Sequence, residues 1–316
     1  MHIKDLVIKL MHIIKNEKWS ILIYEIDDIN QIFDLDDREP KLIISEFGFR
    51  KSYSYKSTMA DPFLFQYGNY LYIFYEIQND FEHGEIWVSA IDKSGNIINF
   101  KKVLKEDYHL SYPNVFKYEN KIYMMPEMGR SGSTYLFEAI DFPKKWKKVK
   151  RLIDGRLFDP NIIFVDDGVF VFGTVNSILK MYYSESLYSE FREVLEITSD
   201  KKTNRNAGPI ISINGSMYRF AQNCHNFYGE DISVHKILNI NKSNYVEIKY
   251  TDPLIKKPHI LIENGYHHIS TASFNGAIYV AVDGRRKDSS VNNLMLLLYK
   301  VISKVAGIFK NKSSAI

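Results

Sequence analysis

Short apolar runs separated by polar turns fill most of this chain, and four of them begin in the same way. In each, a dipeptide ending in proline opens a strand-like run, the chain turns at glycine or asparagine, and a second run rich in aromatic residues follows. The prolines stand at Pro62, Pro113, Pro160 and Pro209, with spacings of 51, 47 and 49 residues. A fifth copy, without the proline, extends from His268 to Val280.

A period of about 50 residues built from short strands is typical of the blades of a β-propeller. Third strands are predicted in the alternating runs Gly84–Ala90, Ser133–Ala139, Leu179–Ser184 and Asp231–Leu238. A single blade cannot bury both of its faces, so the blades must pack around a common axis. The pattern therefore predicts an all-β fold, a five-bladed β-propeller with short N- and C-terminal helices.

The two ends of the chain differ from the repeats. Residues 1–17 carry apolar side chains at helical spacing and predict an amphipathic helix. The propeller is expected to occupy residues 18–290, with the strand Trp19–Ile26 completing the last blade and closing the ring. Residues 291–316 predict a basic amphipathic helix that is too short to span a bilayer. This helix either docks on the propeller or lies in a membrane interface, drawn by anionic lipid.

The repeated prolines indicate where chemistry could be placed. Proline cannot donate a hydrogen bond to a strand ladder, so it belongs at the first residue or the edge of a strand. The residue before each proline is then expected near a strand start, at the mouth of the central funnel. These residues are Asp61, Tyr112, Asp159 and Gly208, with His268 or Ile269 in the fifth copy.

Composition and charge narrow the choice of partners. A chain with 45% hydrophobic and 14% aromatic residues can bury a large core. The net charge of +3 is too small to indicate a nucleic-acid partner, although six basic residues crowd residues 144–151. We interpret that run as a solvated outer strand; a phosphate-bearing ligand or an anionic membrane surface is the alternative.

Two further features bear on location. A single cysteine, Cys224, excludes an internal disulfide framework and fits a reducing compartment. The first residues lack the form of a secretion signal, because Lys4, Asp5 and Lys9 interrupt the apolar positions. We therefore expect a cytoplasmic protein, peripheral at the inner face of the membrane if the C-terminal helix lies in an interface.

Several multi-residue strings resemble a family of five-bladed propellers. The family is named for the N-terminal domain of plant glucosamine inositolphosphorylceramide transferase and also has stand-alone bacterial members. The resemblance covers about residues 18–286. Its strings include Ala60-Asp61-Pro62-Phe63-Leu64, Ser111-Tyr112-Pro113, Met125-Pro126-Glu127, Asn206-Ala207-Gly208, Tyr218-Arg219-Phe220-Ala221-Gln222 and Val282-Asp283-Gly284-Arg285. Two positions depart from the family pattern: Gly208 precedes Pro209 where arginine is usual, and Phe220 replaces a common proline.

The resemblance implies a fold akin to the propeller glycosidases and a role in carbohydrate chemistry. Propeller glycosidases direct carboxylates into the funnel, where one activates a nucleophile and another donates a proton. Asp61 and Asp159 occupy matching strand-start positions, and Glu127 follows Pro126 within an apolar strand, where burial would raise its pKa. We expect these three residues to be catalytic, with Glu76 as a further carboxylate of the substrate site. An alternative for Asp61 and Asp159 is a turn-capping role.

Other side chains are expected to bind substrate. Arg219 interrupts an apolar strand and could hold a phosphate, or pair with Asp61 or Asp159. Aromatic rings suit sugar faces, and amides suit sugar hydroxyls. His268 is either a base or a buried core histidine. The expected binding residues are Glu76, Tyr112, Arg219, Gln222, Tyr228, His268, Asp283 and Arg285. No Cys/His cluster or glycine-rich phosphate loop stands out, so we expect neither a metal nor a cofactor.

These expectations converge on a glycosyltransferase in surface-polysaccharide or glycolipid biosynthesis. Its substrates would be a nucleotide sugar or phospho-sugar donor and a glycan or glycolipid acceptor. Asp61 or Glu127 would accept the proton of the acceptor hydroxyl, and Arg219, with His268, would stabilise the leaving phosphate. Two alternatives stay open: a glycoside hydrolase of the five-bladed type, and a non-catalytic sugar-binding propeller that partners a separate transferase.

Overall fold

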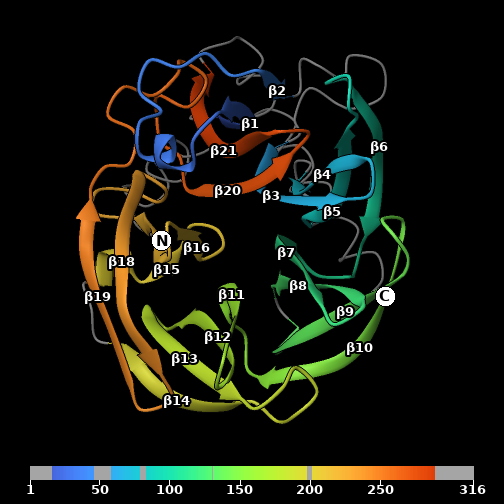
Figure 1. Ribbon diagram of the computed structural model, residues 1–316, viewed down its shortest axis with the longest axis vertical. Helices are drawn as coiled ribbons and strands as arrows, with labels where there is room; N and C mark the ends of the chain where they lie inside the picture. Colours follow the sequence, from blue (N-terminus) through green and yellow to red (C-terminus); the bar gives the residue numbers. More distant parts are fainter. Residues whose placement is uncertain (1–15, 46–57, 79–82, 130, 198–200, 289–316) are drawn as a thin grey trace, which may run out of the picture. The chain divides into compact units, whose positions relative to one another are not determined.

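Five β-sheets are arranged around one axis within Trp19–Arg285 (Figure 1). Four of them have four strands, and one has five. The computed structural model describes residues 16–45, 58–78, 83–129, 131–197 and 201–288. The five-bladed propeller predicted from the proline spacing is confirmed, and so are the four third strands. The expected helix 291–316 and residues 1–15 of the expected N-terminal helix lie outside the described residues.

The first three blades are simple four-stranded meanders in which the first strand lies innermost. Blade one contains β3 (Thr58–Tyr67), β4 (Tyr70–Gln78), β5 (Glu85–Ile91) and β6 (Ile97–Leu104). Blade two contains β7 (Leu110–Tyr118), β8 (Lys121–Met128), β9 (Ser133–Asp141) and β10 (Lys145–Asp154). Blade three contains β11 (Phe158–Val165), β12 (Gly168–Val175), β13 (Ile178–Ser184) and β14 (Arg192–Ile197).

Blade four has a divided inner strand. Its inner position is shared by β15 (Arg205–Asn206) and β16 (Ile211–Ile213), which both pair with β17 (Ser216–Asn223). The outer strands are β18 (Asp231–Asn241) and β19 (Asn244–Thr251). A short 3-10 helix, η3 (Lys201–Thr203), leads into this blade.

The N-terminal strand closes the ring, as predicted. Blade five has the order β2-β1-β21-β20, so it joins β1 (Asn16–Ile26) and β2 (Leu42–Ile44) to β20 (His268–Phe274) and β21 (Ala277–Asp288). Because β1 begins at Asn16, the last two residues of the expected N-terminal helix belong to this strand instead. The 3-10 helix η1 (Ile29–Phe33) connects β1 to β2.

Both faces of each blade are buried against the neighbouring blades. In β1, Ile21 and Ile23 pack in the core between blades five and one, whereas Leu22 and Tyr24 pack in the core between blades four and five. Successive side chains of a strand point to opposite faces. A strand buried on both faces therefore needs apolar residues at consecutive positions, which explains the unbroken apolar runs of the sequence.

The outermost strand of blade two carries the basic run. Lys145, Lys147, Lys148 and Arg151 on β10 are exposed, so the prediction of a solvated outer strand is confirmed. Among the residues that the structure describes, no helix has the length and apolar character needed to cross a membrane.

The residue before each repeated proline has a left-handed backbone. The φ angles are 55° at Asp61, 49° at Tyr112, 49° at Asp159 and 121° at Gly208. In the first three blades the ladder also shifts register at this point. A left-handed φ costs a residue with a side chain about 1–3 kcal/mol, so the surrounding structure must hold it in place. Asp61, Tyr112 and Asp159 therefore each stand at a β-bulge of their own blade.

Candidate active site

A pocket of about 260 Å³ lies where the innermost strands begin. Every blade contributes to its lining, as expected for residues that start radially packed strands. The lining residues are Trp19, Thr58, Ala60, Asp61, Glu76, Gln78, His109, Ser111, Glu127, Arg156, Phe158, Asp159, Arg205, Tyr228 and His267. Five of the predicted site residues are among them: Asp61, Glu76, Glu127, Asp159 and Tyr228.

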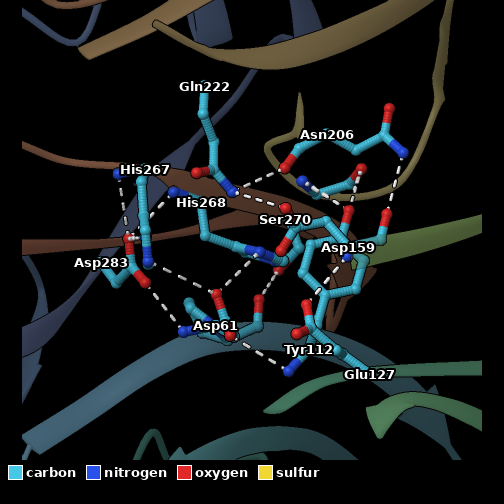
Figure 2. Close-up of polar contacts among 12 residues, drawn as sticks. Asp61, Tyr112, Glu127, Asp159, Asn206, Gln222, His267, His268, Ser270 and Asp283 are labelled. Carbon is cyan, nitrogen blue, oxygen red and sulfur yellow. Dashed lines mark hydrogen bonds and ion pairs between the residues drawn. The ribbon is translucent and has the colours of Figure 1, made fainter. Parts of the chain in front are cut away.

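Three buried carboxylates connect neighbouring blades at the bulges (Figure 2). Each accepts the backbone N–H of a left-handed residue: Asp283 Oδ2 from Asp61 at 2.8 Å, Asp61 Oδ2 from Tyr112 at 3.1 Å, and Glu127 Oε2 from Asp159 at 3.0 Å. The bulge frees these N–H groups from the ladder, and a buried N–H without a partner is costly. The same carboxylates that approach the pocket therefore also stabilise the backbone that carries them.

Asp159 is held from several sides. Arg205 donates from Nε to Oδ2 at 2.5 Å and from Nη2 to Oδ1 at 3.0 Å, which is a bidentate ion pair. Gln222 donates to Oδ2 at 3.1 Å, and the Asn206 side chain donates to the Asp159 carbonyl at 2.8 Å. These contacts leave Asp159 little freedom, so it is suited to orienting Arg205 rather than to moving.

Glu127 combines burial with a nearby cation. Arg156 Nη2 donates to its Oε1 at 3.2 Å, and Arg205 Nη2 lies 4.0 Å from Oε2. Burial and the adjacent Asp159 carboxylate raise the pKa of Glu127, although Arg205 works in the opposite direction. A carboxyl group with a raised pKa is the kind that can donate or accept a proton near neutral pH.

Asp61 is the other buried carboxyl suited to proton transfer. Burial raises the pKa of Asp61 to about 7, His267 opposes the rise, and the carboxylates Asp283, Asp159 and Glu127 add to it. Because Oδ2 accepts the Tyr112 N–H, a proton on Asp61 would sit on Oδ1.

Glu76 is paired with an imidazole. Gly84 N–H donates to His109 Nδ1 at 3.0 Å, so the neutral ring carries its hydrogen on Nε2, which lies 3.3 Å from Glu76 Oε1. Burial raises the pKa of Glu76 well above its ordinary value, with Asp61 contributing further. The Glu76 carboxyl and the His109 ring therefore form a buried pair on the pocket wall, in which burial favours the protonated form of the carboxyl group.

Aromatic rings and arginines alternate along one side of the rim. The Arg156 guanidinium lies 4.0 Å from the centre of the Phe158 ring, and Arg205 lies 5.4 Å from Phe158 and 5.0 Å from Tyr228. Behind the lining residues, Arg285 lies 5.6 Å from the Trp19 ring. Rings of this kind stack against sugars and nucleobases, and guanidinium groups bind phosphate or carboxylate.

Arg219 does not lie at the pocket, so this part of the prediction is wrong. Its side chain is fully buried and donates to Glu247 at 2.7 and 2.5 Å and to the Thr203 carbonyl at 3.1 Å. Arg219 lies in the middle of β17, with its side chain on the face opposite to Tyr218 and Phe220, which pack between blades four and five. Its partner is therefore Glu247 on β19 rather than a funnel carboxylate or a ligand.

Tyr112 and His268 lie beneath the pocket rather than in its lining. Tyr112 is fully buried; its hydroxyl accepts from Gly208 N–H and donates to the Gly208 carbonyl, both at 2.9 Å, so its ring does not face a sugar. His268 is fully buried between Phe63 and Tyr112, and burial lowers its pKa to about 3. His268 is not among the lining residues, so the structure supports the alternative of a buried core histidine over a role at a leaving phosphate.

The remaining predicted binding residues support the pocket from behind. Gln222 holds Asp159, and Asp283 holds the backbone of Asp61 and the ring of His267. Arg285 donates to the Asn264 carbonyl at 2.8 Å and lies against Trp19. All three are buried, so their effect on a ligand would be indirect.

Sequence reasoning missed Arg156, Arg205, Trp19, Phe158 and His267 as lining residues. The prolines offered a signal for some of them, because Arg156 and Arg205 each stand four residues before one, at Pro160 and Pro209. Trp19 was assigned only to the closing strand, and His267 was passed over for its neighbour. Which of two adjacent histidines faces a pocket depends on where β20 begins, and the hydrophobic pattern does not locate that boundary.

One group of acidic and imidazole side chains has the closeness of a metal site. Asp61, His267 and Asp283 place one potential ligand atom each within 4.8 Å of one another, the one such group among the described residues. The oxygens of Asp283 and one oxygen of Asp61 already accept N–H groups. We therefore describe this group as a hydrogen-bonded network and do not assign it as a set of metal ligands.

A second hollow, of about 310 Å³, lies between the outer strands β14 and β19. It is lined by Leu195, Glu196, Ile197, Asn244, Tyr245, Val246 and Glu247. Glu247 is already paired with Arg219, and Glu196 lies 2.9 Å from Lys180. This hollow lacks the converging carboxyl groups of the funnel pocket, which is therefore the better candidate site.

Comparison with known proteins places the chain next to plant transferases. The family model described as "Glucosamine inositolphosphorylceramide transferase 1, N-terminal" matches residues 44–285. A protein of Oryza sativa subsp. japonica named glucosamine inositolphosphorylceramide transferase 1 is 34% identical over 249 residues, covering 73% of this chain and 34% of the relative. Its namesake in Arabidopsis thaliana is 33% identical over 205 residues, covering 60% of this chain and 27% of the relative. The chain thus spans about a third of the length of these relatives.

Similar solved structures are glycoside hydrolases. An α-L-arabinofuranosidase from Lactobacillus brevis has a TM-score of 0.54 at 11% identity, covering 75% of this chain and 86% of its own. A GH43 β-xylosidase/α-arabinofuranosidase from a compost microbial metagenome has a TM-score of 0.52 at 12% identity, covering 76% and 94%. At this identity the similarity supports the fold alone.

Proposed function

The chain belongs to the family of the glucosamine inositolphosphorylceramide transferase N-terminal domain, and on this premise we propose that it is a carbohydrate-active propeller that transfers a glycosyl group. The observation that carries the proposal is the convergence of Asp61, Glu127 and Asp159, from three blades, on one pocket with aromatic walls. The raised pKa of Asp61 and Glu127 supports acid–base chemistry there.

Asp61, Arg156 and Arg205 each have a role in the proposed reaction, and Glu127 is the alternative base. Asp61 accepts the proton of the acceptor hydroxyl while the oxygen of that hydroxyl bonds to the anomeric carbon. The bond from that carbon to the phosphate oxygen of the donor breaks, and the leaving phosphate takes the electron pair. Arg156 and Arg205 on the rim balance its charge, a duty expected earlier of Arg219. The Arg156 side chain is 37% exposed and lines the pocket, so its guanidinium group is accessible to a ligand.

The substrates we propose are a nucleotide sugar or phospho-sugar donor and a glycan or glycolipid acceptor. The relatives named for inositolphosphorylceramide support a glycolipid acceptor, and the arginine-lined rim supports a phosphorylated donor. The neutral sugar would lie over the carboxyl groups, with the phosphate held at the rim.

Turnover measurements with a donor panel test this proposal. Purified protein is incubated with nucleotide sugars and a glycolipid extract, and nucleoside diphosphate release and mass-labelled product are followed. Asp61→Asn and Glu127→Gln should lower turnover roughly 10²–10⁴-fold, the usual contribution of a general acid or base. Turnover that both variants retain would rule out this pocket as the reaction site.

A sugar-binding role is the second candidate, because the matched region covers about a third of the plant relatives and leaves room for a separate catalytic region there. In that case a ligand would raise the melting temperature of the wild type, while neither transfer to an acceptor nor hydrolysis of aryl glycosides occurs. Hydrolysis of aryl glycosides without transfer would instead indicate a glycoside hydrolase, the activity of the similar solved structures.

A further inference from the structure

We infer that His267 is the positioning residue that exchanges a proton with Asp61, and that Asp283 holds its imidazole in the tautomer this exchange requires. The inference rests on the proposed transfer at the same pocket. It concerns a residue that touches the pocket without having a role in the reaction described above. Three observations support it: the partner of each imidazole nitrogen, the packing of the ring, and the atom of Asp61 that remains available.

Asp283 determines which ring nitrogen carries the hydrogen. Its Oδ1 lies 2.8 Å from His267 Nδ1 and accepts the backbone N–H groups of His267 at 3.2 Å and His268 at 2.9 Å. Burial alone would raise the pKa of Asp283, but His267 outweighs it and the pKa is lowered. An ionised Asp283 requires a donor at Nδ1, so Nε2 is the nitrogen that gains and loses a proton.

Packing fixes the direction of the His267 ring. The His267 ring lies 4.2 Å from the Trp19 ring at 33° and 5.3 Å from the Tyr228 ring at 89°, measured between centroids. Gly229, with φ 63°, closes over them: an added Cβ there would come within 3.1 Å of Trp19 and 3.2 Å of His267. The imidazole therefore cannot turn without moving the turn that follows β17.

Nε2 of this fixed ring faces the available oxygen of Asp61. The distance from His267 Nε2 to Asp61 Oδ1 is 3.8 Å, whereas Asp61 Oδ2 is occupied by the Tyr112 N–H. His268 Nδ1 lies 3.6 Å from the same Oδ1, but its pKa of about 3 keeps that ring neutral. A proton that Asp61 receives on Oδ1 therefore has His267 as its acceptor.

The proton balance is complete without a further reactant. The acceptor hydroxyl gives its proton to Asp61 Oδ1 as the new glycosidic bond forms. Asp61 then passes the proton to Nε2 of the neutral His267 ring, once these two atoms close from 3.8 Å to hydrogen-bond distance. The resulting imidazolium is balanced by the Asp283 carboxylate. When product leaves, the proton passes from His267 to water in the pocket, and His267 is again neutral beside an ionised Asp61. Burial disfavours the charged ring, but Asp283 and Asp61 outweigh it and raise the pKa of His267.

Several other charged groups face this pair. Asp159 on β11 and Glu127 on β8 raise the pKa of Asp61, and Asp159 also raises that of His267. Because His267 lowers the pKa of Asp61, removing the imidazole should raise it further. A base must be ionised to act, so the acidic limb of the pH profile should move to higher pH.

Two measurements test the inference. In the full chain, His267→Gln should lower kcat/KM roughly 10²-fold and shift the acidic limb of its pH profile upward. The matched control is His235→Gln, since His235 is also buried and lies 3.4 Å from a carboxylate, Glu247, outside the pocket. The His235→Gln variant should leave the acidic limb of the pH profile of kcat/KM unchanged. Unchanged turnover and an unchanged limb in His267→Gln would overturn the inference.

The second measurement needs no turnover. Nitrogen-15 spectra of the histidine rings should show His267 with hydrogen on Nδ1, titrating at Nε2, and Asp61→Asn should move this titration to lower pH. A His267 ring with hydrogen on Nε2, or a titration that Asp61→Asn leaves unchanged, would contradict the coupling. If the wild type transfers no glycosyl group, the proposed function fails, and these spectra alone decide whether His267 and Asp61 share a proton.

Discussion

Asp61 has two tasks that pull its chemistry in different directions. As a structural residue it accepts the Tyr112 N–H and holds a φ of 55°, and an ionised oxygen would serve best for that contact. As a base near neutral pH it benefits from burial, which penalises the ionised form. The two oxygens divide these tasks, because Oδ2 faces the backbone and Oδ1 faces His267 at 3.8 Å.

Replacing Asp61 by asparagine or alanine separates the two tasks. Asparagine keeps an oxygen for the Tyr112 N–H and tolerates a left-handed φ, so at about pH 4, where Asp61 is protonated in the fold, Asp61→Asn should stay close to wild type in stability. At neutral pH the same variant should lose turnover. Asp61→Ala leaves the buried N–H without a partner and should cost about 1–3 kcal/mol. Urea unfolding of both variants measures the difference. Equal stability of the two variants would show that the Tyr112 contact contributes little.

The pH dependence of stability is a second expectation at this scale. The pKa of Asp61 is about 7 in the fold against an ordinary value of 3.8, so between these values the folded state binds more protons than the unfolded state. Stability should therefore fall as pH rises from about 4 to about 7, with a slope of at most about 1.4 kcal/mol per pH unit. The raised pKa values of Glu127 and His267 act in the same direction.

Unfolding in urea at several pH values, for the wild type and Asp61→Asn, isolates this contribution. The variant carries no titrating group at position 61, so its curve should fall less steeply over the same interval. A wild-type curve that rises toward neutral pH, or a variant with the wild-type slope, would contradict the raised pKa.

Among the elements, the innermost strands are the ones to which the proline repeat of the sequence corresponds. Proline spacing predicted the number of blades, and the position before each proline predicted two of the pocket carboxylates. The left-handed bulge was not predicted, because a residue before proline usually adopts an extended conformation. Asp61, Tyr112 and Asp159 depart from this rule only because carboxylates from other blades accept the N–H groups that the bulge frees.

Gly208 tests whether the left-handed backbone is essential at the matching position of blade four. With φ 121°, an added Cβ would stand 1.8 Å from the Ile269 carbonyl oxygen of blade five, too close for any adjustment of a side chain. Gly208→Ala should therefore prevent folding or destabilise the protein by more than about 3 kcal/mol. Soluble yield and thermal unfolding measure the effect.

Gly68 provides the matched control for that substitution. It also has a positive φ, of 58°, in the turn between β3 and β4, but nothing lies within 4 Å of an added Cβ. Gly68→Ala should cost about 1 kcal/mol from backbone strain alone. Comparable losses in the two variants would mean that the approach to Ile269 is not what requires glycine at position 208.

At the scale of the whole molecule, the site could be predicted only in outline. Asp61 and Asp159 were predicted because each precedes a proline of the repeat, and Glu127 because it follows Pro126 within an apolar strand. The ring brings these three positions together. Arg219 was misplaced because the face of β17 that it occupies depends on the packing of Glu247 from β19. Arg205 and His267 needed the actual strand starts, which periodicity leaves uncertain by a few residues.

Ring closure is the last expectation and belongs to the molecule as a whole. Leu22 on β1 is fully buried in the core between blades four and five, beside residues of β17, β18 and β21. Leu22→Ala should cost about 2–5 kcal/mol. Glu25→Ala on the same strand, where the side chain is exposed, should cost little.

The way in which Leu22→Ala unfolds tests the closure itself. Blades that share cores on both faces should unfold together. The stability lost in Leu22→Ala should therefore appear as a lower midpoint temperature of a single unfolding transition. The three tryptophans stand in β1, blade one and blade two, at Trp19, Trp87 and Trp146, and single-tryptophan variants can report each region separately. Trp19 should report the same midpoint as the other two, in both wild type and Leu22→Ala. An earlier transition at Trp19 alone would mean that β1 detaches while the remaining blades hold, and that the ring does not depend on its closing strand.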